Sequence, residues 1–238
     1  MIYLALGDSI THGYDSTALE RRYVDVLTRK LNRLRRTSTY VHAKPGWTSA
    51  QLLRSLDRIP ECILQEAELV TLMIGGNDLL KEFPWFLDDP DEAMERLRRS
   101  FHPKVDEILG IAVKNPSAKV VLCTVYNPFP KAEVAQMAVT GINSLLKEIA
   151  QSRGCLLAPV DAMYGGQEER LVSGFRRGEL QDFRLLRNPI HPNDAGHERI
   201  AEAIFQTYRK ALPKAAQGRV ISRKKRASGS RQHAARSV

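Results

Sequence analysis

The stretch IYLALGDSITHG at residues 2–13 decides the fold that we predict for this chain. Its first half, IYLAL, has the length and apolar character of a buried strand, and the polar segment GDSITHG follows it directly. Ser9 therefore stands at the end of the first predicted strand. Because open parallel sheets collect their chemistry at the carboxyl ends of their strands, Ser9 is the candidate nucleophile of a site at that edge.

Three further polar segments occupy comparable places along the chain. KPGWTS at 44–49 follows STYVHA, and IGGND at 74–78 follows ELVTLM. NPIHPNDAGH at 188–197 precedes the last segment of helical period. Four polar segments at one edge of a sheet indicate a functional site more strongly than any one of them alone.

Apolar runs alternate with segments of helical period over most of the chain. The runs lie at 2–6, 38–43, 68–74, 118–125 and 155–160, and the helical segments at 16–36, 48–56, 89–114, 131–152 and 194–212. This pattern predicts an α/β fold, a three-layer α/β/α sandwich whose five-stranded parallel sheet has a flavodoxin-like strand order. We expect Pro103 to kink or split its helical segment, and residues 161–187 to form a loop with at most one short helix.

Length and composition bound the class of protein. A chain of 238 residues suits one domain with a substantial core, and 43% apolar with 26% charged residues is ordinary for a globular protein. No apolar run has the length of a transmembrane helix, and no basic leader precedes residues 2–6, so we expect a cytoplasmic protein without a signal peptide. Cys62, Cys123 and Cys155 lack metal-ligand spacing and are expected to be buried free thiols. With no phosphate-binding loop, zinc motif or dinucleotide motif in the sequence, we assign no cofactor and no metal.

The net charge of +9 is concentrated at the C-terminal end of the chain. Residues 214–238 carry eight Lys and Arg residues and no acid, which leaves 28 basic against 27 acidic residues in 1–213. We therefore divide the chain into a domain at 1–213 and a basic, disordered tail at 214–238. Such a tail is suited to an anionic partner such as nucleic acid, anionic lipid or polymer; the alternative is a solvated and dispensable tail.

Over about residues 2–212 the chain resembles the SGNH (GDSL) hydrolase family. Ser9 in GDS, Gly46, Asn77 in GGND and His191 in HPND match, in order, the four residues after which the family is known. The resemblance implies the same three-layer fold and a serine esterase or lipase-type hydrolase. Its substrate would be a small-molecule or lipid ester with an acyl or acetyl group, lysophospholipids included.

The resemblance also implies a role for each of the four residues. A serine hydroxyl is a poor nucleophile until a base accepts its proton, and His191 is the candidate base for Ser9. The oxyanion hole would consist of the backbone N–H groups of Ser9 and Gly46 and the side-chain amide of Asn77. Taken singly, Ser9 suits a helix cap and the glycine segments suit turns; only their joint occurrence favours a catalytic site.

One position differs from the family pattern. The acid usually found three residues before the histidine is Asn188 here, which has no charge to stabilise an imidazolium. His191 could be oriented by Asn188 itself, by a backbone carbonyl at or near residue 188, or by Asp182 or Asp194. Asp194 is better placed to cap the last helix. Two functions stay open: a serine esterase of low or moderate efficiency, and a non-catalytic binding protein of the SGNH fold whose turnover is impaired by Asn188.

Overall fold

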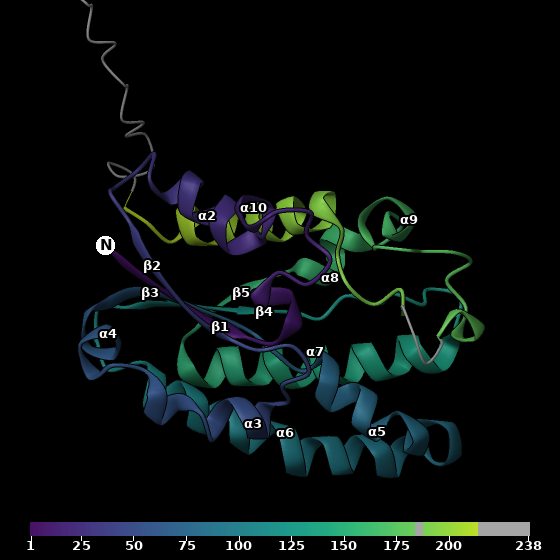
Figure 1. Cartoon of the computed structure of the whole chain (residues 1–238). Helices are drawn as coiled ribbons and strands as arrows, with labels where there is room; N and C mark the ends of the chain where they lie inside the picture. The colour runs from purple at the N-terminus through teal and green to yellow at the C-terminus, as the bar shows by residue number, and fades with distance from the viewer. Residues whose placement is uncertain (184–187, 214–238) are drawn as a thin grey trace, which may run out of the picture.

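A parallel sheet forms the middle layer of the structure, a computed structural model that describes residues 1–183 and 188–213 (Figure 1). Its strands are β1 (Ile2–Gly7), β2 (Ser38–Ala43), β3 (Ala67–Met73), β4 (Lys119–Cys123) and β5 (Leu156–Ala158). They pair in the order β2-β1-β3-β4-β5, and every pair is parallel. The predicted sandwich with a flavodoxin-like sheet is thus confirmed, and each strand coincides with one of the apolar runs.

Both faces of the sheet are buried, which explains why its strands are apolar without alternation. Along β1 the side chains of Tyr3 and Ala5 join one hydrophobic cluster, while Leu4 and Leu6 join another on the opposite face. All four side chains are fully buried. Successive residues of a strand point to opposite faces, so a strand covered on both sides needs an apolar residue at each position.

Two layers of helices cover the sheet (Figure 1). One layer contains α2 (Tyr23–Leu31), α8 (Val160–Tyr164), α9 (Glu168–Leu171) and α10 (Asp194–Lys210). The other contains α3 (Ser49–Leu53), α4 (Glu61–Glu66), α5 (Gly76–Asp88), α6 (Pro90–Ala112) and α7 (Glu133–Arg153). The four-residue helix α1 (Ser9–His12) follows β1 directly, and short 3₁₀ turns occupy Leu19–Arg21, Leu56–Arg58 and Leu180–Asp182. None of the helices in the described ranges combines the length and apolar character needed to cross a bilayer.

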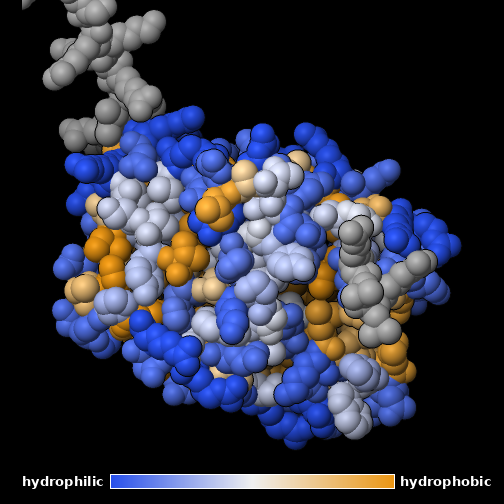
Figure 2. All heavy atoms as spheres, viewed as in Figure 1, coloured by the Kyte–Doolittle hydropathy of each residue, from blue (hydrophilic) through white to orange (hydrophobic). Residues whose placement is uncertain are grey.

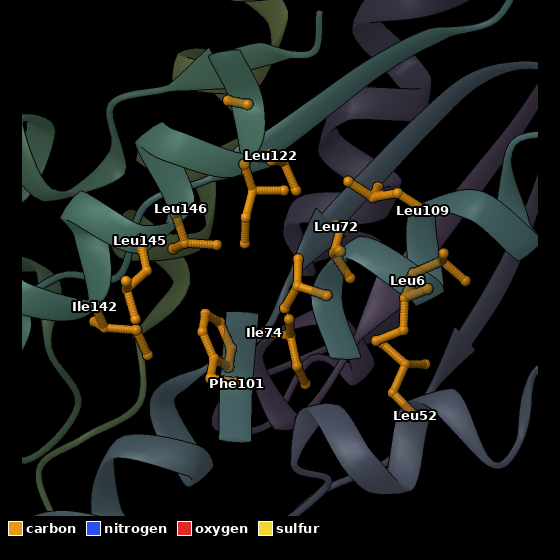
Figure 3. Close-up of a cluster of buried hydrophobic side chains, with 14 of the residues drawn as sticks. Leu6, Leu52, Leu72, Ile74, Phe101, Leu109, Leu122, Ile142, Leu145 and Leu146 are labelled. Atoms are coloured by element: carbon orange, nitrogen blue, oxygen red, sulfur yellow. The ribbon is translucent and has the colours of Figure 1, made fainter. Parts of the chain in front are cut away.

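The larger of the two cores lies between the sheet and the layer that contains α6 and α7. Figure 3 shows Phe101 of α6 and Ile142, Leu145 and Leu146 of α7 in the same cluster as Leu122 of β4. Each of these side chains is at most 1% exposed to solvent. Burial of this amount of apolar surface is the main force that holds the helices on the sheet.

The helical segments differ from the prediction in three places. Pro103 lies inside α6 and does not split it, because the buried stripe of Phe101, Val105 and Ile108 continues across the proline and keeps both halves on the core. Helices α4 and α5 were not predicted from the sequence. Residues 161–183 hold two short helices and a 3₁₀ turn rather than one helix. The predicted tail at 214–238 lies outside the described residues.

The junction between β1 and α1 has room only for glycine at position 7. A Cβ atom on Gly7 would lie 2.1 Å from Oγ1 of Thr11 and 2.3 Å from the backbone carbonyl oxygen of Met73. The carbonyl belongs to β3 and cannot move without disturbing the sheet. Gly7 therefore allows α1 to begin directly against the end of the central strands.

We predict that Gly7→Ala lowers the free energy of unfolding by about 1–3 kcal/mol, the usual effect of an added methyl group in a packed site. The control is Gly110→Ala in α6, where the nearest atom to an added Cβ is Nη2 of Arg153 at 3.9 Å. The free energy of unfolding of that variant should rise by up to about 1 kcal/mol, since alanine is a better helix former than glycine. Urea unfolding measures both, and a Gly7→Ala variant as stable as the wild type would contradict the packing argument.

Candidate active site

Ser9 lies beyond the carboxyl end of β1, as the first residue of α1. Asp8 caps this helix, because its Oδ1 accepts a hydrogen bond from the Ile10 N–H at 3.0 Å. The helix ends at Gly13, whose φ of +99° lies in the left-handed region that favours glycine. Ser9 is 7% exposed, and its backbone N–H is among those that a helix start leaves without an intrahelical acceptor.

His191 reaches Ser9 from the loop that precedes α10. Its Nε2 lies 3.0 Å from the Ser9 Oγ, the hydrogen-bonded geometry that activation of a serine requires. The loop is held on both sides of the histidine. The Tyr126 hydroxyl donates to the Ile190 carbonyl at 2.6 Å, and the Ser173 N–H donates to the His191 carbonyl at 2.8 Å.

The other ring nitrogen of His191 faces a carboxylate. Nδ1 lies 3.9 Å from Oδ2 of Asp15, in the turn that follows α1. The ring of Tyr14 packs against the imidazole with their centroids 4.4 Å apart. Burial lowers the pKa of His191, and the negative charge of Asp15 acts in the opposite direction.

Asp15 was not predicted from the sequence, because an acid that orients His191 was expected close to the histidine along the chain. The one available signal was that Asp15 follows the GDS segment by a few residues. Of the residues considered, Asn188 uses its backbone carbonyl to accept from the Ile190 N–H at 2.9 Å. The Asp182 carboxylate accepts hydrogen bonds from three backbone N–H groups of its own turn, those of Arg177, Gly178 and Glu179.

The start of α10 also differs from the expectation. Asn193 is the capping residue, since its side chain accepts from the Gly196 N–H at 3.0 Å. Asp194 instead binds Thr17, whose N–H donates to Oδ1 at 2.9 Å and whose hydroxyl donates to Oδ2 at 2.6 Å. Asp194 therefore fastens the turn after α1 to α10.

The loops that follow β2 and β3 are tied to one another. Nδ2 of Asn77, in the first turn of α5, donates one of its two hydrogens to the Trp47 carbonyl at 2.9 Å. The neighbouring Asp78 accepts from the N–H of Ser49 at 2.9 Å and from its hydroxyl at 2.6 Å. Gly46 lies in the same loop with a φ of +81°, and a side chain there would meet open space. Its backbone conformation, rather than crowding, is what favours glycine.

A cavity of about 380 Å³ opens beside Ser9. Ser9, Asn77 and His191 line it together, whereas Gly46 is not part of its wall. The remainder of the wall is mostly apolar and comes from α5, from the loop at 125–129 that follows β4, and from α7, with Phe83, Phe129 and Val139 among its residues. Figure 2 shows apolar side chains gathered over the region where these helices lie in Figure 1. The volume falls within the range of small-molecule sites.

Two buried titratable groups flank the site. Burial raises the pKa of Asp8 to about 7. Burial lowers the pKa of His197 to about 4, so this imidazole is neutral at pH 7. Its Nδ1 accepts from the Tyr23 N–H at 3.4 Å, which leaves Nε2 protonated to donate to the Tyr14 carbonyl at 3.2 Å.

In the described part of the chain, no three His, Cys, Asp or Glu residues are grouped so that they could hold a metal ion.

Known proteins that resemble this chain in sequence and in structure are lipases and related acylhydrolases. The sequence profile of the GDSL-like lipase/acylhydrolase family matches residues 5–199. The chain is 26% identical to the spore germination lipase LipC of Bacillus licheniformis over 212 residues, which cover 85% of this chain and 93% of the lipase. The crystal structure of the lipase Lip_vut3 from a goat rumen metagenome is similar with a TM-score of 0.68 and 25% identity, over 87% of this chain and 97% of that one. An extracellular lipase from Streptomyces rimosus shares the fold, with a TM-score of 0.66 at 16% identity over 89% of this chain and all of its own.

Proposed function

The chain belongs to the GDSL-like lipase/acylhydrolase family, and from this membership we propose that it hydrolyses carboxylic esters with Ser9 as nucleophile and His191 as base. One observation carries the proposal. The Ser9 Oγ and the His191 Nε2 lie 3.0 Å apart in the wall of an apolar cavity, so a nucleophile, its base and space for an acyl group coincide.

In the proposed reaction, His191 accepts the Ser9 proton while Oγ attacks the carbonyl carbon of the ester. The tetrahedral intermediate collapses, the bond to the alcohol oxygen breaks, and the alcohol leaves with the proton from His191. Water then hydrolyses the acyl-enzyme with His191 again as base. Only neutral His191 can accept a proton, and the lowering of its pKa by burial supports that form at neutral pH.

We assign the oxyanion hole to the backbone N–H groups of Ser9 and Gly46 and to the side-chain amide of Asn77. The position of Ser9 at the start of α1 supports the first donor, since this N–H is free of an intrahelical acceptor. Asn77 lines the cavity and is oriented by its bond to the Trp47 carbonyl. Gly46 lies in the loop held by the same bond.

We propose that the acyl group of the substrate occupies the cavity between α5 and α7. The wall is apolar where it is lined by Leu80, Phe83 and Val139, which suits an aliphatic chain rather than an acetyl group alone. Lysophospholipids are one class of ester with such a chain. A binding protein without turnover is the competing function, and the experiment on Ser9 distinguishes the two.

Treatment with a fluorophosphonate should place one covalent adduct on the peptide that contains Ser9. The reagent requires a serine activated by a base, so a protein that only binds esters should not react. Mass spectrometry after proteolysis identifies the site, and Ser9→Ala is the control. Labelling that persists in Ser9→Ala, or its absence in the wild type together with absence of ester hydrolysis, would overturn the proposed function.

Asn77→Ala should lower kcat by roughly 10²–10³ and leave KM nearly unchanged, because an oxyanion donor acts mainly in the transition state. Asn77 also contacts the Trp47 carbonyl, so circular dichroism and thermal unfolding are needed to show that the variant is folded. A folded Asn77→Ala enzyme with the kcat of the wild type would remove this side chain from the oxyanion hole.

With p-nitrophenyl esters of increasing acyl length, kcat/KM should rise roughly fourfold for each methylene until the cavity is filled, since each buried methylene contributes about 0.8 kcal/mol. Ala138→Phe, on the cavity wall, should abolish that rise while acetyl ester hydrolysis continues. Met137→Phe is the matched control, because Met137 is 49% exposed on the same helix. If Ala138→Phe lowered kcat/KM equally for acetyl and long-chain esters, the cavity would not be the acyl site.

A further inference from the structure

The base of the proposed reaction needs a partner at its second ring nitrogen. A carboxylate that accepts from Nδ1–H selects the tautomer whose Nε2 can accept the serine proton, and it stabilises the imidazolium that forms. At the position where the family usually has this acid, three residues before the histidine, this chain has Asn188. Within residues 1–183 and 188–213, Asp15 is the carboxylate that lies within ion-pair distance of His191, at 3.9 Å from Nδ1.

The backbone of Asp15 is held in an uncommon conformation. Its φ of +63° makes it the one non-glycine residue of the described chain with a positive φ. This left-handed conformation is strained for most L-residues, although aspartate tolerates it better than most. The turn is closed by the Tyr14 N–H, which donates to the Ser9 carbonyl at 2.9 Å, and by the Ser16 hydroxyl, which donates to the Gly13 carbonyl at 2.7 Å. The turn that holds Asp15 is thus bonded to the nucleophile's own backbone.

Helix α10 anchors this turn on both sides of Asp15. On one side His197 donates to the Tyr14 carbonyl at 3.2 Å. On the other side Asp194 accepts from the N–H and the hydroxyl of Thr17. His191, Asp194 and His197 all belong to the segment HPNDAGH at 191–197. One short segment therefore supplies the base and fixes the turn that carries Asp15.

We propose that Asp15 is the positioning carboxylate of His191, in place of the acid that this chain lacks at position 188; the inference rests on the proposed esterase function. The separation of 3.9 Å is longer than a hydrogen bond, so Oδ2 must approach Nδ1–H for the bond to form. Such bonds are commonly long before substrate binds and shorten in the reacting complex. Tyr14, packed on the imidazole, limits the directions in which the ring can turn.

The pH profile of activity alone would not isolate this contact. Besides Asp15, the titratable groups around His191 are His197 of α10, Asp8 before α1, and the phenols of Tyr14 and Tyr126. The pKa of Asp8 is raised to about 7 by burial, so this residue titrates in the range where activity would change. The protonation of His191 must therefore be observed directly.

The experiment is an NMR titration of protein labelled with ¹³C and ¹⁵N in histidine, comparing wild type with Asp15→Asn. The His191 signals are assigned from their loss in His191→Gln. Removal of the negative charge should move the titration of His191 to lower pH and decrease the population of its Nδ1–H tautomer. In parallel, kcat/KM should fall roughly 10- to 100-fold. The fall is smaller than the full effect of general base catalysis, because His191 itself is still present in the Asp15→Asn variant.

Two further variants control the measurement. Glu20→Gln removes one negative charge from an exposed side chain in the 3₁₀ turn that follows, and it should change neither the titration nor the rate. Asp15→Gly removes the carboxylate with a residue that accepts the positive φ without strain, so it should reproduce the shift seen in Asp15→Asn even if that variant folds poorly.

The outcomes separate this inference from the proposed function. If the wild type hydrolyses esters and the His191 titration is the same in Asp15→Asn and Asp15→Gly, Asp15 does not position the base. The same conclusion follows if Asn188→Ala, rather than the Asp15 variants, shifts the titration. If the titration shifts as expected but the wild type neither hydrolyses esters nor reacts with a fluorophosphonate, the contact is present and the proposed function is overturned.

Discussion

The structure depends on the position of β1 between β2 and β3. The chain leaves β1 to form β2 on one side and returns to form β3 on the other, so the loops after β1 and β3 diverge at the carboxyl edge of the sheet. A crevice forms where they diverge, and Ser9 and Asn77 lie in it because each follows its strand by a few residues. The absence of a side chain at Gly7 brings α1 directly against this edge. The location of the site thus follows from the order of the strands.

The segment at 191–197 holds the polar side of the candidate site together at this edge. It places His191 beside Ser9, caps α10 through Asn193, and fastens the turn after α1 through Asp194 and His197. His197 can perform this task because burial keeps it neutral, with one ring nitrogen accepting and the other donating. Ser9, His191 and the carboxylate of Asp15 are therefore positioned by one set of hydrogen bonds rather than independently.

The apolar cavity has a different origin from the polar site. Its wall comes from α5, the loop at 125–129 and α7, and α5 was not predicted from the sequence because its first residues belong to the segment GGND, which suits a turn. In the folded protein Gly75 ends the loop with a φ of +121°, and the helix starts at the next residue. The same short segment therefore presents Asn77 to the site and begins one wall of the cavity, which local composition cannot reveal.

The sequence by itself determined the five strands, their parallel arrangement and the edge at which Ser9, Asn77 and His191 meet. It could do so because a strand buried on both faces leaves a continuous apolar run, and because the segments of Ser9 and Asn77, which directly follow such runs, gather at one edge. The place of His191 was implied by the resemblance of HPND to the family motif. Only the tertiary structure decided that Asp15 faces His191, that Asn193 rather than Asp194 caps α10, and that the helix of Pro103 stays whole. Each of these depends on partners distant in the chain: a carboxylate meets an imidazole, or a core compensates for a lost hydrogen bond, only after the layers have packed. Spacing along the sequence records the periodicity of one element, and it does not record which side chains of other elements will lie against it.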